Sequence, residues 1–136
     1  MTDKALPLIY SCSGCSNVAQ LANSVAVAMS HQGLAEMSCI AGVGGGVKPL
    51  VRKAQSNRHI IALDGCVLHC VKHCLENQGV EATMHMTLSD LDMGLKKRNG
   101  TLYDDETRDK VIQTIELQFK EIIDSRSQLQ VDESMT

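Results

Sequence analysis

The sequence predicts an α/β protein with an open sheet of about four parallel strands, in the order 2-1-3-4, and helices on both faces. Short apolar runs typical of strands alternate with helical patterns along the chain, in the order βαβαβαβα. A recurring unit of strand, cysteine, glycine and helix supports this reading. The composition agrees, because 43% of the 136 residues are hydrophobic and 21% are charged, as in a globular domain. Right-handed crossovers favour the strand order.

The first strand–helix unit occupies residues 5–12 and 16–33. The run "ALPLIYSC" is apolar until its last two residues and predicts a buried strand. In the following segment apolar residues recur at helical spacing. Ser16 or Asn17 can cap this helix, and Gly33 ends it.

In the second strand–helix unit, the sequence predicts a strand over residues 34–42 and a shorter helix over residues 47–57. Between them lies the glycine-rich stretch 42–46. Pro49 fits only in the first turn of the helix, where its missing N–H has no partner to lose. A third buried strand, "RHIIALDG", is predicted over residues 58–65.

A third helix is predicted over residues 66–79, with Gly79 at its end, followed by a fourth strand over residues 80–88. Residues 89–100 form a polar connector. The last helix, residues 104–126, has the clearest pattern, because acidic residues crowd its start and an apolar stripe runs along it. The stripe consists of Ile112, Ile115, Phe119, Ile122 and Ile123.

We therefore expect one α/β domain over residues 1–124 and a polar, frayed C-terminal tail over residues 125–136. The net charge of −3 and an aromatic content of 2% argue against nucleic-acid binding. We also expect no membrane span and no secretory signal, and hence a cytoplasmic protein with reduced thiols. Six cysteines in such a protein favour metal binding or redox chemistry over a disulfide framework.

Four of the cysteines follow predicted strands. Cys12 and Cys15 follow the first strand in "CSGC", Cys39 lies at the end of the second, and Cys66 follows the third in "DGC". Because sites in open α/β sheets form outside the carboxyl ends of the strands, we expect these thiols to converge. A four-thiolate zinc site is the simplest interpretation, with Cys70 as a substitute or fifth ligand.

The helix predicted from residue 66 constrains the remaining ligands. Cys66 and Cys70 would lie about 6 Å apart along it and could share one ion, whereas Cys74 would be about 12 Å from Cys66. Cys74 is therefore interpreted as a small buried apolar residue. His69 and His73 are candidates for hydrogen bonds to the ligands, against the alternative of solvated helix histidines.

Several of these features have a plainer interpretation. "CSGC" also has the spacing of a redox dithiol, and the cysteines could be unrelated small residues at tight turns. Gly44 and Gly45 could bind a small anion, or belong to a flexible turn. Asp64 could cap the following helix. Lys96 and Lys97 are interpreted by default as part of a solvated loop.

The three motifs "YSCSGCSNVAQLAN", "EMSCIAGVGG" and "IIALDGCVLHC" resemble the DGC-domain family, whose members are proposed to bind zinc. The resemblance covers roughly residues 7 to 98. The family's cysteines correspond to Cys12, Cys15, Cys39, Cys66 and Cys70. A proline often follows the DGC cysteine in that family, where this sequence has Val67, and the thiol pattern is unaffected. The resemblance implies zinc binding and no known reaction.

Two classes of function follow from the sequence. The first is a metal-binding protein, with zinc as the expected ion, that handles metal or sulfur. The alternative is a thiol-based redox or sulfur-transfer enzyme in which Cys12 or Cys66 is the reactive thiolate. An iron–sulfur cluster is a further option, since four thiolates also suit that cofactor. The sequence identifies no substrate, no protein partner and no oligomeric state.

Overall fold

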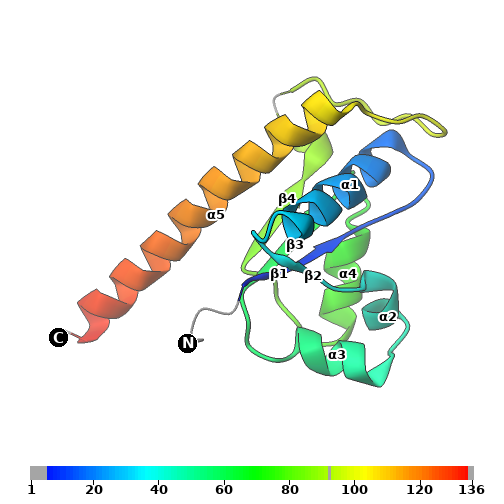
Figure 1. Cartoon of the computed structure of the whole chain (residues 1–136). Helices are drawn as coiled ribbons and strands as arrows, with labels where there is room; N and C mark the ends of the chain where they lie inside the picture. The colour runs from blue at the N-terminus through cyan, green and yellow to red at the C-terminus, as the bar shows by residue number, and fades with distance from the viewer. Residues whose placement is uncertain (1–5, 92, 135–136) are drawn as a thin grey trace.

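The computed structural model describes residues 6–91 and 93–134, with side chains as far as residue 125. Four strands form one parallel sheet in the order β2-β1-β3-β4, which confirms the predicted fold class and strand order (Figure 1). Strand β1 lies inside the sheet and pairs with both β2 and β3. The strands are β1 (Leu8–Ser11), β2 (Glu36–Met37), β3 (Ile60–Asp64) and β4 (Met84–Thr87).

Helices pack on both faces of this sheet (Figure 1). They are α1 (Asn17–His31), α2 (Ile40–Gly44), α3 (Lys48–Ala54), α4 (Cys70–Asn77) and α5 (Asp105–Ser134), with a 3₁₀ turn, η2 (Leu88–Asp90), after β4. Helices α1 and α5 cover one face, and α2, α3 and α4 cover the other. None of the helices formed by the described residues combines the length and the apolar character needed to cross a membrane.

The alternation of side chains along each strand produces two cores. Ile9 and Ile61 point to the face of α1 and α5, where they pack with Val25 and Ile115. The intervening side chains, such as Tyr10, point to the opposite face. That second core consists of Leu8, Tyr10, Val43, Ala54, Ile60, Ala62, Val71, Leu75 and Val80.

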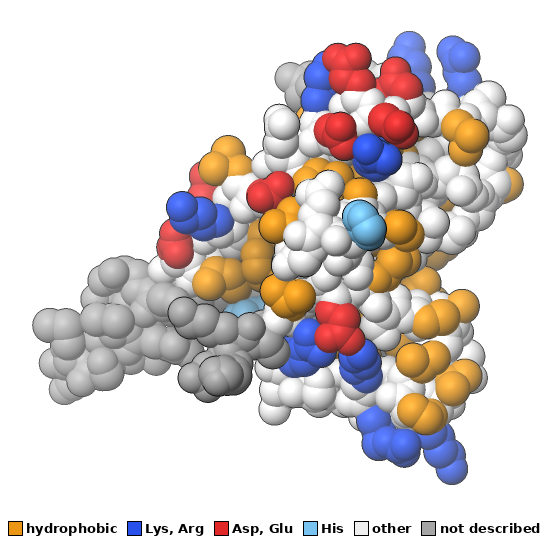
Figure 2. Space-filling model, in the orientation of Figure 1, with side chains coloured by type: hydrophobic (Ala, Val, Ile, Leu, Met, Phe, Trp, Pro, Cys, Tyr) orange, Lys and Arg blue, Asp and Glu red, His pale blue; other side chains and the backbone are white. Residues whose placement is uncertain are grey.

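The last helix is longer than predicted. Residues 125–134, expected as a tail, continue the backbone of α5, whereas residues 135 and 136 lie outside the described part of the chain. The physical reason is that the sequence contains no glycine or proline after Gly100 to interrupt the helix. Acidic side chains gather over the start of α5, where the helix dipole favours them, while lysine and arginine side chains lie over α3 (Figure 2).

Helix α4 begins four residues later than predicted, at Cys70 instead of Cys66. Residues 66–69 form a turn that ends at His69, whose φ of 54° is left-handed. The prediction that Cys66 and Cys70 lie on one helix is therefore wrong, since only Cys70 belongs to α4. The second predicted strand is also shorter, because α2 already starts at Ile40.

Gly65 lies at the closest approach of the sheet to helix α1. A Cβ atom on Gly65 would lie 2.7 Å from the backbone nitrogen of Ala19 and 2.8 Å from the carbonyl oxygen of Val18. Backbone atoms of a packed helix cannot move aside as a flexible side chain can. Only glycine therefore allows the turn after β3 to pass so close to the start of α1.

We expect Gly65→Ala to lower the free energy of unfolding by about 1–3 kcal/mol, because the added methyl group forces α1 away from the sheet. Gly14→Ala is the matched control, since a Cβ atom there meets nothing within 4 Å. Chemical denaturation of both variants checks the expectation. Equal stabilities for the two variants would contradict it.

Candidate functional site

Asp64, at the end of β3, is the buried charge around which the site is built. Its side chain is 1% exposed. Oδ1 accepts the backbone N–H of Val71 at 2.8 Å, and Oδ2 accepts that of Lys72 at 3.2 Å. Oδ2 also lies 2.7 Å from Nε2 of His85. These bonds confirm the prediction that Asp64 caps the helix that follows, and they explain why α4 starts at Cys70.

Two histidines and a threonine extend this arrangement. Nε2 of His69 lies 2.9 Å from Oγ1 of Thr87. The rings of His69 and His85 meet edge to face, with their centroids 4.9 Å apart. His69 is therefore held in place and is not a solvated helix histidine. Sequence reasoning missed His85, although a histidine between two methionines in a buried strand was a usable signal.

The thiol of Cys12 lies against the DGC turn. Its sulfur accepts the backbone N–H of Gly65 at 3.1 Å. Burial raises the pKa of the Cys12 thiol from its ordinary value of 9.0 to about 11, and the negative charges of Asp64, Cys70 and Cys66 act in the same direction. The structure thus brings Cys66 and Cys70 within electrostatic range of Cys12. We call this cluster the thiol edge.

Cys66 has a cationic neighbour, because Nζ of Lys97 lies 3.6 Å from its sulfur. The segment around Lys97 is fixed by Asn17 at the start of α1. The side-chain amide of Asn17 donates to the carbonyl of Lys96 at 3.0 Å and accepts the N–H of Arg98 at 2.7 Å. Lys96 and Lys97 are exposed in a segment without helix or strand, which agrees with the default interpretation of a solvated loop, and the bonds of Asn17 attach this loop to α1.

The remaining three cysteines have separate environments. The exposed thiol of Cys15 lies 3.5 Å from Oδ1 of Asn99. Cys39 is also exposed, and its sulfur accepts the N–H of Gly42 at the start of α2. Cys74 packs against Gly44, where a Cβ atom would come within 2.8 Å of the sulfur. The contact agrees with the packing role expected for Cys74 as a small buried apolar residue, although the side chain is only half-buried.

The chemistry of these donors suits a soft metal ion, because thiolates are the preferred ligands of zinc and of iron–sulfur clusters. The positions of the thiols, however, do not make up a complete metal site. Among the side chains described, those of residues 6–91 and 93–125, no three histidines, cysteines or carboxylates form a group that could hold a metal ion. The predicted ligand set of Cys12, Cys15, Cys39, Cys66 and Cys70 therefore stays a prediction.

The glycine-rich stretch has a packing role in this fold. Gly42 faces Leu50 of α3, where a Cβ atom would lie 2.0 Å from Cδ1, and Gly44 faces Cys74 of α4. Glycine at these positions lets α2 lie close to both neighbouring helices. The expected anion site at Gly44 and Gly45 stays a prediction.

The raised pKa of Cys12 makes stability depend on pH. Below about pH 9 the thiol is protonated in both the folded and the unfolded chain. Between about pH 9 and 11 the unfolded chain loses this proton while the folded chain keeps it, so the free energy of unfolding falls as the pH rises. We expect chemical denaturation under reducing conditions to show that, between about pH 9 and 11, the free energy of unfolding falls more for the wild type than for Cys12→Ser. Identical falls would refute this assignment.

Comparison with known proteins agrees with the motifs at this site. The family model described as the DGC domain matches residues 8–115. The anaerobic and virulence modulator AnvM of Pseudomonas aeruginosa is 63% identical over 98 residues, which cover 72% of this chain and 73% of that protein. No solved structure matches. The Asp64–Gly65–Cys66 turn, the extent of the family match and this identity lead to one conclusion: the chain belongs to the DGC-domain family.

Proposed function

We propose that this chain is a regulatory protein that binds a thiophilic metal ion, zinc in the first place, through its thiol edge. The observation that carries the proposal is that the sulfur of Cys12 lies 3.1 Å from the backbone nitrogen of Gly65 in the DGC turn, with Cys66 and Cys70 within electrostatic range. The regulatory part rests on the relative that is named an anaerobic and virulence modulator. Thiols that stay reduced at low oxygen are suitable ligands in such a protein.

The residues of the thiol edge would each have a defined task. Zinc would supply a positive charge that draws the proton off Cys12, so binding releases protons. The N–H of Gly65 and the ammonium group of Lys97 would offset part of the negative charge of the thiolates. Cys15, exposed after β1, or Cys39, exposed before α2, would supply the fourth thiolate.

Elemental analysis of the chain, purified without oxygen and without a metal-binding tag, tests the proposal. We expect about one zinc ion per chain and no colour. Cys12→Ser and Cys66→Ser should each weaken zinc binding at least about tenfold in a chelator competition, because each removes one thiolate. Cys74→Ser is the matched control and should bind zinc as the wild type does, since Cys74 packs between α2 and α4.

Other metal contents would contradict zinc binding in distinct ways. Iron together with visible absorption would identify an iron–sulfur protein, which uses the same donors. A chain that takes up no metal when zinc is added would refute metal binding and leave the thiols to act as redox groups.

A second candidate function, thiol-based redox or sulfur-transfer chemistry, is favoured by the contact between Lys97 and Cys66. A nearby cation stabilises a thiolate, whereas burial keeps Cys12 protonated. Cys66 is thus the better candidate for the attacking group. Its thiolate would attack a low-molecular-weight disulfide and release one thiolate. Cys12 or Cys70 would then displace the second thiolate and give up its proton.

This role for Lys97 predicts a change in thiol reactivity. Lys97→Met should slow the alkylation of Cys66 by iodoacetamide at neutral pH by about two- to fivefold, since the exposed ion pair contributes modestly. Mass spectrometry of the peptide that contains Cys66 measures the rate. Lys96→Met is the matched control. If both variants react as fast as the wild type, Lys97 does not activate the thiol.

A further inference from the structure

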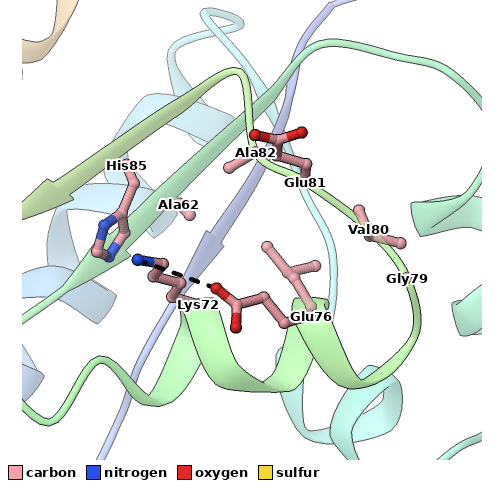
Figure 3. Close-up of a pocket in the computed structure, with 9 residues that line it drawn as sticks. Ala62, Lys72, Glu76, Gly79, Val80, Glu81, Ala82 and His85 are labelled. Carbon is pink, nitrogen blue, oxygen red and sulfur yellow. Dashed lines mark ion pairs between the residues drawn. The ribbon is translucent and has the colours of Figure 1, made fainter.

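A groove away from the thiol edge lies between helix α4 and the start of strand β4 (Figure 3). Its volume is about 420 Å³, within the range of roughly 300–1,000 Å³ typical of small-molecule sites. Two alanines, Ala62 on β3 and Ala82 before β4, help to form it, because their small side chains leave space beside the helix. Together with Leu75 and Val80 they give the groove an aliphatic floor.

Four polar side chains surround this floor: Lys72, Glu76, Glu81 and His85. The amino group of Lys72 extends toward His85, and the carboxylate of Glu81 lies on the other side of the groove (Figure 3). Lys72 is paired only loosely with Glu76, at 3.9 Å. The ring of His85 is fixed through Nε2 by the buried Asp64. The groove therefore offers Lys72, with Glu76 beside it, at one end and Glu81 across an apolar floor.

We propose that this groove binds a small zwitterion, namely a free amino acid with an aliphatic side chain. Its carboxylate would replace that of Glu76 beside Lys72, its ammonium group would pair with Glu81, and its side chain would cover Val80 and Ala82. A simple anion would be repelled by the two glutamates, and a simple cation by Lys72. A zwitterion places a negative charge beside Lys72 and a positive charge beside Glu81. A simple anion or a simple cation can satisfy only one of these two residues.

Titration of the ¹⁵N-labelled chain with L-leucine, followed by NMR, tests the proposal. We expect saturable shifts of the amide signals of Lys72, Ala82 and His85. The probes 4-methylpentanoate and 3-methylbutylamine keep the aliphatic part of leucine but carry one charge each. Both should bind at least tenfold more weakly than leucine. No saturable shift by about 10 mM leucine, or equal binding of the amine, would overturn the proposal.

Substitutions locate the binding site. Lys72→Met and Glu81→Gln should each weaken leucine binding at least tenfold, and Ala82→Leu should abolish it by filling the groove. The matched controls, Lys48→Met on α3 and Glu121→Gln on α5, should leave binding unchanged, because both residues are exposed outside the groove. Thermal unfolding verifies that each variant is folded. Unchanged binding in folded Lys72→Met and Glu81→Gln would place leucine elsewhere and overturn the proposal.

Discussion

The burial of the Asp64 carboxylate is the constraint on which the rest of the site depends. A charge removed from water is destabilising by several kcal/mol unless it is paired and hydrogen-bonded. Here the backbone N–H groups of Val71 and Lys72 and the ring of His85 provide those bonds. Each bond also fixes an element. Helix α4 must begin at Cys70, the ring of His85 is oriented, and the intervening turn must carry Cys66 back over the end of β1.

Gly65, which directly follows the buried Asp64, gives the thiols of Cys12 and Cys66 different surroundings. Because it has no side chain, its backbone packs on α1 and its N–H reaches the sulfur of Cys12. Cys12 is half-buried, and burial raises its pKa to about 11, although the N–H of Gly65 acts in the opposite direction. Cys66, one residue further along, lies beside Lys97 instead. The two cysteines thus differ in their surroundings: burial raises the pKa of Cys12, whereas Cys66 has the ammonium group of Lys97 beside it.

The fold was predictable from local patterns, whereas much of the site was not. Apolar runs, glycines and the cap at Ser16 were sufficient for the strand order and for helix α1. The start of α4 could not be predicted from the local sequence, because "CVLHC" is compatible with a helix that begins at Cys66. The residue that caps the helix, Asp64, lies six positions before Cys70. His85 and Lys97 depend on long-range contacts. Asn17 holds the carbonyl of Lys96 from 79 positions away, and the register of β4 places His85 near Asp64.

The two cores also bear on which kind of metal site the thiol edge could form. Both faces of the sheet are closed by aliphatic side chains, with Ile9, Tyr10 and Ile61 almost fully buried. Small domains whose folding requires zinc lack such a core. In this chain the fold half-buries Cys12 and Cys66, while Cys15, Cys39 and Cys70 are exposed. A metal bound there would add little to folding, so it could be gained and lost without unfolding the protein, as a regulatory ion must be.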